Sequence, residues 1–419
     1  MRRGAALALA SATAAAAMSV PASAQPASDG GLVRAPPSGA PAPPNDLPAR
    51  AWVLMLERSG HVIAGSNADE ELAIASTTKL MTAYVTLAHE PVGKLLAEQP
   101  YTQTAEGESL APVPAGAQLS VPDMLRAMLL PSGNNVASSL SIDVGGSTTA
   151  FVSEMNAAAA ALGLGRTHYT TPIGLDTPPG NYSTAVDLAQ LARVLMRDKV
   201  VRQIVDEPRA QLADGIVVDN RNDLVGEYPW IVGVKTGNTS AAGECLVAAA
   251  KLDGVRLISV VLGAPSENAR DSDTLAILRY GLSLYRSAQI SQRGRVYARI
   301  PVAGRHRTVK LVAARTSRLV LARSVVLHVA LRVPGHVRGP LPAGAAAGAL
   351  EVTENGRAVA SIPLLTARAV PAPLPPPPKR RTRQAVWLAA GGGLAIMLAG
   401  CSLPFMRRRA TRSAPGLDP

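Results

Sequence analysis

The segment AIASTTKLMTAYVTLAHE, residues 73–90, places a serine and a lysine at the start of a helical pattern that runs to about Glu90. Residues three apart lie one turn along the same helix face, so the Lys79 amine can reach the Ser76 hydroxyl. The N-terminus of a helix also supplies backbone N–H groups and a partial positive charge that stabilise an anion. Taken alone, Ser76 has the simpler interpretation of a helix N-cap, and Lys79 that of an exposed helix lysine.

Two further motifs follow the first in order along the chain. Apolar residues over 122–130 predict a short helix, after which Ser132-Gly133-Asn134 forms a polar turn before a second helix near Val136. A strand over 232–234 then leads into Lys235-Thr236-Gly237. Each motif is weak by itself, because such short patterns arise by chance. All three in order within one domain indicate a nucleophile, its base and an anion clamp in a single site.

Lysine usage supports this interpretation. Lysine occurs at only seven positions, and two of them, Lys79 and Lys235, stand in the motifs. The first motif needs a group that can lose its proton near neutral pH. Arginine cannot do so, whereas a desolvated lysine beside other cations can.

The N-terminal segment has the pattern of a secretory signal peptide over residues 1–24. Arg2 and Arg3 supply the positive start, residues 5–20 the apolar stretch, and Ala22-Ser23-Ala24 a small-residue cleavage site. Residues 25–48 are rich in Pro, Ala, Gly and Ser, which predicts a disordered or extended linker.

The C-terminal segment predicts a membrane anchor. Residues 385–405 form an apolar run of 21 residues, which is long enough to span a bilayer. Residues 367–384 precede it as a proline-rich and basic spacer, and residues 406–419 follow as a short tail. Because the signal peptide sends the body outward, we expect a single-pass protein of the cell membrane with its catalytic domain on the extracytoplasmic side.

The charge distribution argues against a nucleic-acid-binding protein despite the net charge of +12, because ten of the 42 Lys and Arg residues lie in residues 1–24 and 379–419. Residues 51–290 hold 17 basic and 25 acidic residues, whereas residues 291–360 hold 12 basic and two acidic ones. This contrast predicts two extracytoplasmic domains, 49–288 and 289–366. The basic domain would favour anionic lipid headgroups or wall polymers, unless its arginines only reflect the coding sequence.

The cysteines exclude a disulfide framework. Cys245 and Cys401 are the only two, and the second lies inside the predicted span, so no disulfide can close within the secreted domains. We expect Cys245, in an apolar run, to be a buried small hydrophobic residue. We expect no metal and no cofactor.

Apolar periodicity outlines the two domains. The first domain is expected to hold two hairpins and several further helices, and the second a set of short β-branched strands that suggests a small β-sandwich. The hairpins are predicted over 51–56 with 61–64 and over 244–252 with 255–263, and the helices over 150–162, 185–196 and 271–286.

With these motifs the chain resembles the low-molecular-mass penicillin-binding proteins, the serine-type D-alanyl-D-alanine carboxypeptidases of the peptidase S11 family. Further segments look like that family, namely 174–176, 182–184, 187–189, 220–222 and 242–247. The resemblance runs from about Asp46 to about Pro363. It implies an α+β fold, with a penicillin-binding/β-lactamase-like domain of five antiparallel strands flanked by helices, then the small β-sandwich and the transmembrane helix.

The resemblance implies a mechanism for the catalytic residues. Ser76 would attack the carbonyl between two D-alanines of a peptidoglycan stem peptide while Lys79 takes its proton. Ser132 would relay the proton to the departing amine, and Asn134 would orient the substrate and Lys79. Water would then hydrolyse the acyl-enzyme, which trims pentapeptides and so limits cross-linking. A β-lactam would acylate Ser76 in the same way, but its ring-opened remnant blocks the water.

The resemblance also implies the substrate-binding residues. Lys235 and Thr236 would hold the terminal carboxylate, and Gly237 would let the strand approach closely. The backbone N–H groups of Ser76 and Asn238 would form the oxyanion hole. Relatives often carry His where Asn238 stands, which should alter rate or specificity more than the kind of reaction. The expected partners are therefore stem peptides, β-lactams and, through the C-terminal helix, the membrane, with no nucleic acid.

Three alternatives remain open from the sequence. A β-lactamase would need a carboxylate that drives deacylation, typically in Glu-x-x-Leu-Asn, and no such run lies between Asn135 and Val234. A D,D-endopeptidase that cuts cross-links would share all three motifs. A non-catalytic, β-lactam-binding scaffold protein of the wall machinery would be expected to have lost Ser76 or Lys79, and both are present.

Overall fold

The computed structural model describes residues 39–105, 107–176, 180–213 and 215–375. The predicted signal peptide, the membrane span over 385–405 and the tail over 406–419 lie outside the described residues, as do the first part of the linker and the second part of the spacer. In the described part of the chain, no helix has both the length and the apolar character needed to cross a bilayer.

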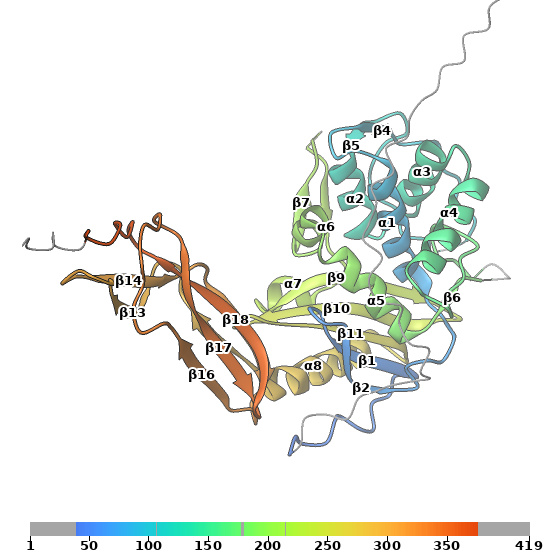
Figure 1. Ribbon diagram of the computed structural model, residues 1–419. Helices are drawn as coiled ribbons and strands as arrows, with labels where there is room; N and C mark the ends of the chain where they lie inside the picture. The colour runs from blue at the N-terminus through green and yellow to red at the C-terminus, as the bar shows by residue number, and fades with distance from the viewer. Residues whose placement is uncertain (1–38, 106, 177–179, 214, 376–419) are drawn as a thin grey trace, which may run out of the picture.

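A five-stranded antiparallel sheet organises the first half of the molecule (Figure 1). Its strands lie in the order β2-β1-β11-β10-β9, so the chain's N-terminal hairpin and a later meander share one sheet. The strands are β1 (Ala51–Leu56), β2 (His61–Ser66), β9 (Ile231–Thr239), β10 (Gly243–Leu252) and β11 (Val255–Ala264). Both predicted hairpins are therefore confirmed, and β9 with the third motif is an edge strand.

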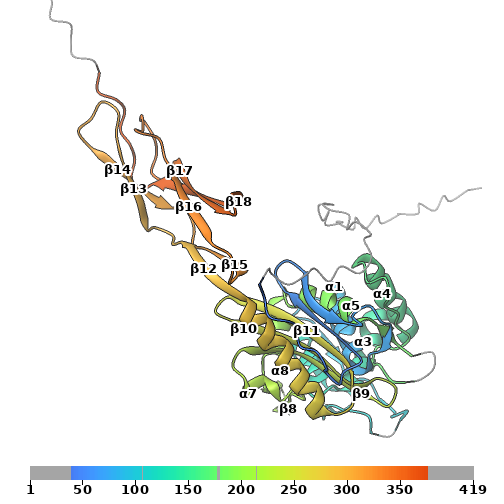
Figure 2. The same ribbon diagram turned by 90° about the horizontal axis from the view of Figure 1, so that it is seen from below.

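Both faces of this sheet are buried, which explains the continuous apolar run of β1. Val53 and Met55 point into the core that the sheet shares with the helical layer. Trp52 and Leu54 point the other way, into a second core. Helix α8 (Glu267–Leu284) covers that second face, as Figure 2 shows from below.

The helical layer covers the first face of the sheet and carries the first two motifs. It also includes three two-stranded sheets, which pair β3 with β6, β4 with β5 and β7 with β8. The helices of this layer are η1 (Ala75–Thr78), α1 (Lys79–His89), α2 (Val121–Leu129), α3 (Asn134–Gly145), α4 (Thr148–Ala161), α5 (Ala185–Leu195) and α6 (Lys199–Ile204). The short helix α7 (Leu224–Glu227) instead packs Leu224 and Val225 into the second core. The short strands are β3 (Leu72–Ala73), β4 (Leu95–Ala97), β5 (Gln118–Ser120), β6 (Tyr182–Ser183), β7 (Arg209–Gln211) and β8 (Val217–Asp219).

Two helices begin earlier than their sequence pattern predicts. Helix α3 begins at Asn134, because Ser132 adopts a left-handed φ of 66° and the Asn134 N–H donates to the Ser109 carbonyl at 2.8 Å. Helix α8 begins at Glu267, because the Ser266 hydroxyl caps it by accepting from the Ala269 N–H at 3.2 Å. A backbone contact at α3 and a side-chain cap at α8 therefore extend these helices beyond the residues that the apolar pattern marks.

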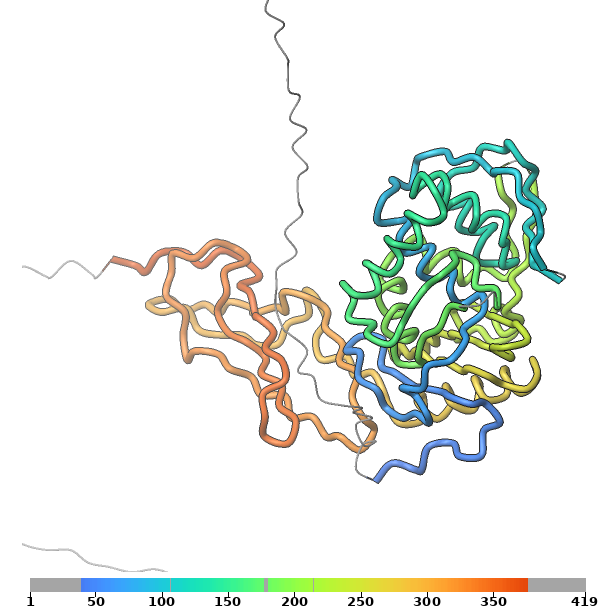
Figure 3. Tube along the Cα trace, turned by 90° about the vertical axis from the view of Figure 1, so that its right-hand side faces the viewer, coloured from blue at the N-terminus to red at the C-terminus, as the bar shows by residue number. Residues whose placement is uncertain are grey.

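A second, β-rich unit follows α8 without a loop. Strand β12 continues directly from α8 and pairs with β15, and the next strands form a five-stranded sheet in the order β13-β14-β18-β17-β16. Figures 1 and 3 both show this unit extending away from the first. Its strands are β12 (Tyr285–Ser291), β13 (Val296–Pro301), β14 (Thr308–Ala313), β15 (Ser317–Ala322), β16 (Leu327–Arg332), β17 (Ala346–Glu354) and β18 (Arg357–Thr366).

The described ends of the chain pack against the two units. Ala40 and Leu47, from the predicted linker, contact the core beside α8, and the Tyr280 hydroxyl donates to the Pro41 carbonyl at 3.2 Å. At the other end, Val370 is buried in the core of the β-rich unit. These parts of the predicted linker and spacer are therefore held against folded structure.

The contact between α8 and the sheet makes a prediction about stability. A Cβ on Gly281 would lie 2.7 Å from Leu257 Cδ1 and 2.9 Å from Leu54 Cδ2. We expect Gly281→Leu to lower the free energy of unfolding by about 1–3 kcal/mol in urea titrations, because the core there has no room for a side chain. Gly165→Leu is the control, since a Cβ there meets no atom within 4 Å. Equal stability of both variants would contradict close packing of α8.

Candidate active site

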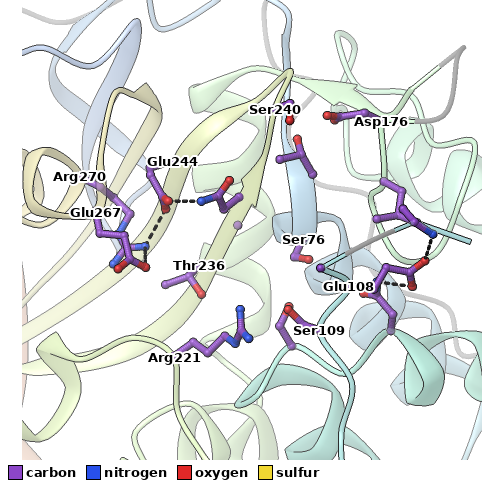
Figure 4. Close-up of a pocket in the computed structure, with 18 of the residues that line it drawn as sticks. Ser76, Glu108, Ser109, Asp176, Arg221, Thr236, Ser240, Glu244, Glu267 and Arg270 are labelled. Atoms are coloured by element: carbon purple, nitrogen blue, oxygen red, sulfur yellow. Dashed lines mark hydrogen bonds and ion pairs between the residues drawn. The ribbon is translucent and has the colours of Figure 1, made fainter. Parts of the chain in front are cut away.

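Residues from all three motifs line one cavity of about 840 Å³. Ser76 comes from η1, Ser132 from the turn before α3, Asn134 from the first position of α3, and Thr236 and Gly237 from β9. Figure 4 shows Ser76 between Thr236 and Glu108, with the Glu244–Arg270 pair beyond Thr236. The fold therefore brings together residues that are up to 161 positions apart in the sequence, as Ser76 and Gly237 are.

The Lys79 side chain is buried and has three oxygen partners. Its Nζ lies 2.9 Å from Ser76 Oγ, 2.7 Å from Asn134 Oδ1 and 2.9 Å from the Ile173 carbonyl oxygen. A protonated lysine donates to all three oxygens. A neutral amine has only two N–H groups and one lone pair. Because a carbonyl oxygen can only accept, the two N–H groups then face Asn134 and Ile173, and the lone pair faces the Ser76 hydroxyl.

The surroundings of Lys79 favour that neutral form. Burial holds the pKa of Lys79 well below its ordinary value, and the positive charges of Lys235 and Arg221 lower it further, while Glu108 acts in the opposite direction. Geometry and electrostatics therefore agree that Lys79 can accept the Ser76 proton.

The Ser132 hydroxyl is buried and forms no hydrogen bond with any residue that the structure describes. Ser132 lines the cavity with a left-handed φ of 66°. Buried hydroxyl groups are normally paired, so an unpaired one in a cavity is available to a bound molecule as both donor and acceptor. A group with both capacities can pass a proton.

Lys235 is a second buried cation, on β9 next to Thr236, which lines the cavity. Its Nζ donates to the Thr236 carbonyl at 3.0 Å. Burial lowers the pKa of Lys235 to about 7, with smaller contributions from Arg221 and Arg270. An anion in the cavity would raise that pKa again, so this site is suited to a carboxylate.

Strand β9 passes directly beside Ser76. A Cβ on Gly237 would lie 3.0 Å from the Ser76 nitrogen and 3.1 Å from the Ile74 carbonyl oxygen, so only glycine allows this approach without displacement. The Asn238 side chain points away from this contact and donates to Glu244. The Asn238 side chain is therefore engaged by Glu244.

Three residues of the site had no role in the sequence analysis. Arg221 lies in a recognised segment but was given no function, and it lines the cavity without an ion pair to any described residue. Arg270 also lines the cavity but is paired with Glu244 at 2.9 Å and with Asp271 at 2.8 Å. Glu108 accepts from Asn134 Nδ2 at 3.0 Å. No motif marks Arg270 or Glu108, so only the fold reveals them.

Cys245 is buried, as predicted, and burial raises the pKa of its thiol to about 12. It is therefore not a nucleophile at neutral pH. Within the described ranges, no group of three or more His, Cys, Asp or Glu residues is placed to hold a metal ion.

The chain is similar to known proteins in both sequence and fold. Residues 38–266 match the family model described as D-alanyl-D-alanine carboxypeptidase. The chain is 32% identical over 333 residues to the D-alanyl-D-alanine carboxypeptidase DacC of Escherichia coli, a match that covers 76% of this chain and 83% of the relative.

Two solved structures extend the similarity to the fold. Penicillin binding protein 6B from Escherichia coli aligns with a TM-score of 0.59 and 28% identity, over 78% of this chain and 98% of that chain. Penicillin binding protein 5 from Haemophilus influenzae aligns with a TM-score of 0.57 and 28% identity, over 78% of this chain and 99% of that chain.

The contacts of Lys79 predict the outcome of one substitution. Lys79→Arg keeps a positive charge but cannot provide a neutral amine, so labelling of Ser76 by a fluorescent penicillin should fall by about 100-fold or more. Lys94→Arg is the matched control, because the Lys94 side chain lies outside the cavity and pairs with Glu90 at 2.7 Å. If the Lys79→Arg protein is folded and labelled at the wild-type rate, Lys79 is not the base.

Proposed function

The chain belongs to the family of D-alanyl-D-alanine carboxypeptidases, and on that basis we propose that it hydrolyses the terminal D-alanyl-D-alanine bond of peptidoglycan stem peptides. It is a serine-type carboxypeptidase of the penicillin-binding protein class. The observation that carries this proposal is the 2.9 Å contact between Lys79 Nζ and Ser76 Oγ, made by a buried amine whose two other partners can only accept. Such a pair is an activated serine nucleophile.

Acylation follows from the positions of the side chains. Ser76 Oγ bonds to the carbonyl carbon of the penultimate D-alanine as its proton moves to Lys79. The C–N bond then breaks, and the terminal D-alanine leaves with the proton that Lys79 took up, which the Ser132 hydroxyl would relay by accepting it and passing its own to the departing amine. The Ser76 and Asn238 backbone N–H groups would stabilise the oxyanion, a contribution usually worth a few kcal/mol. Water then hydrolyses the ester.

Substrate selection is assigned to the cationic side of the cavity. Lys235 and Thr236 would bind the terminal carboxylate, and the approach of β9 at Gly237 would place the scissile carbonyl against Ser76. Arg221 adds an exposed positive charge to the same cavity. A substrate without a free carboxylate would leave Lys235 buried without an anion, which disfavours its charged form.

A β-lactamase would need a carboxylate that activates the deacylating water, and Glu108, the carboxylate that contacts Asn134, is not suited to that role. Burial alone would raise the pKa of Glu108. Hydrogen bonds from Tyr101, Asn134 and the Thr104 and Ala105 backbone outweigh that effect and lower the pKa. These bonds hold the pKa of Glu108 at about 2, so it is a poor base for activating a deacylating water. A D,D-endopeptidase would use the same residues on a cross-linked substrate.

Release of D-alanine tests the proposed reaction. The soluble ectodomain should release free D-alanine from a pentapeptide muropeptide, and Ser76→Ala should abolish the release while leaving the unfolding temperature unchanged. A cross-linked dimer supplied in parallel separates carboxypeptidase from endopeptidase activity. Cleavage of the dimer with no D-alanine from the pentapeptide would favour the endopeptidase, and reaction with penicillin alone would favour the scaffold protein.

We further propose that the protein works on the extracytoplasmic side of the cell membrane, held by a single span over residues 385–405 behind the proline-rich spacer. The support is the order of a signal peptide, two folded units and a final apolar run of 21 residues. The basic β-rich unit would stand closest to the membrane.

A truncation tests this location. A chain stopped at Leu374 should be released into the soluble fraction and remain active, because both folded units precede that residue. The full-length protein should resist alkaline carbonate and need detergent, since a spanning helix is not held by surface charge. Any truncated protein that the basic unit keeps at the membrane should come off with salt. Stripping of the full-length protein by carbonate alone would refute the span.

A further inference from the structure

Glu108 is the acceptor at the centre of a hydrogen-bond cluster between β4 and β5. Its Oε1 accepts from the Thr104 N–H at 2.7 Å, the Thr104 hydroxyl at 3.0 Å and the Ala105 N–H at 2.8 Å. Its Oε2 accepts from the Tyr101 hydroxyl and from Asn134 Nδ2 at 3.0 Å. Both oxygens are therefore held in place, and the carboxylate cannot turn away from Asn134.

This carboxylate determines which way round the Asn134 amide lies. An ionised carboxylate can only accept, so the side of the amide that faces Glu108 must be its NH₂ group. Asn134 Oδ1 then faces Lys79 Nζ, at 2.7 Å. If the amide turned over, its NH₂ would face the Lys79 amine and its oxygen would face the carboxylate, which places two acceptors together.

The orientation of the amide in turn orients Lys79. With Asn134 Oδ1 and the Ile173 carbonyl as two obligatory acceptors, a neutral Lys79 has its lone pair directed at the Ser76 hydroxyl. If Asn134 presented its NH₂ group instead, that group would compete with the Ser76 hydroxyl for the lone pair. With the amide in its observed orientation, the hydrogen bonds run in one direction, because Ser76 donates to neutral Lys79, Lys79 donates to Asn134, and Asn134 donates to Glu108.

Three charged side chains in the described part of the chain shift the pKa of Lys79, and Glu108 is the one that is negatively charged. The other two, Lys235 on β9 and Arg221 on the loop before α7, are positive and lower the pKa of Lys79, whereas Glu108 raises it. Since the pKa of Glu108 is about 2, its charge is present throughout the pH range in which Lys79 can change its protonation state.

We propose that Glu108 is a positioning residue for the reaction of Ser76, which fixes the Asn134 amide with its oxygen toward Lys79 and offsets the positive charges around that amine. It acts through Asn134 and does not itself touch the nucleophile. The proposal rests on one part of the proposed function, the reaction of Ser76 as a nucleophile. It is therefore tested by acylation with a penicillin rather than by D-alanine release.

The decisive variant is Glu108→Gln, which keeps the shape of the side chain but loses its charge and its acceptor-only character. The acylation rate at the pH plateau should fall by about ten-fold or more, because the Asn134 amide is no longer held in one orientation. In a plot of acylation rate against pH, the rise of the rate on the acidic side (the acidic limb) should move to lower pH. The sign follows because removing a negative charge lowers the pKa of Lys79 further, so the neutral amine persists at lower pH.

Two variants separate this role from simple support of the loop. Tyr101→Phe removes one hydrogen bond to Glu108 but leaves its charge, so the acidic limb should stay in place. Glu70→Gln removes a carboxylate from a surface ion pair with Arg50, at 2.7 Å and outside the cavity, so neither plateau nor limb should change. Unfolding temperatures of all variants report whether each protein is folded.

The proposal is overturned if a folded Glu108→Gln protein keeps the wild-type plateau, or if its acidic limb does not move. It is also overturned if Tyr101→Phe shifts the limb as far as Glu108→Gln does, since the effect would then come from the loop. If penicillin acylates the wild-type protein but no D-alanine is ever released, the proposed function fails while this test of Glu108 still stands.

Discussion

Burial of the Lys79 amine is the constraint on which the site depends. An ammonium group removed from water is stable only when its hydrogen-bond donors are satisfied, and here the three acceptors come from three separate segments. Ser76 precedes α1, Asn134 begins α3, and Ile173 lies in the segment before Gly174. That segment packs so closely that a Cβ on Gly174 would lie 2.1 Å from the Ala75 carbonyl oxygen. Lys79 therefore joins Ser76 to the start of α3 and to the segment that contains Ile173.

The same cavity uses two buried lysines for opposite purposes. In the proposed mechanism, Lys79 loses its proton to serve as a base, whereas Lys235 keeps a positive charge to hold a carboxylate. Burial lowers the pKa of both amines, and each has Arg221 as a cationic neighbour. The difference lies in the hydrogen bonds, because Lys79 has three oxygen partners, whereas Lys235 donates to one carbonyl among the described residues. A bound carboxylate would thus add a hydrogen-bond partner to Lys235, whereas the proposed proton transfer uses the partners that Lys79 already has.

Two carboxylates of the site, Glu244 and Glu108, connect separate segments around the cavity. Glu244 pairs with Arg270 and also accepts from the Asn238 side chain, so it joins β9 to the start of α8. Glu108 does the equivalent on the other side of Ser76, where it joins the β4–β5 segment to Asn134. Ser76 lies between the two carboxylates, as Figure 4 shows.

The sequence by itself determined the chemistry and most of the secondary structure of this protein. Ser76, Lys79, Ser132, Asn134 and the Lys235 segment could be recognised because acyl transfer needs those residue types, and the hairpins of the first sheet could be predicted because apolar runs and turn residues are local signals. Only the tertiary structure decided that α3 begins at Asn134 and that Glu108, Arg221 and Arg270 belong to the site. The physical reason is that their partners are distant in the chain, as with Glu108 and Asn134, which are 26 residues apart. Which charges surround a buried amine, and which way an amide turns, depend on packing that no local pattern encodes.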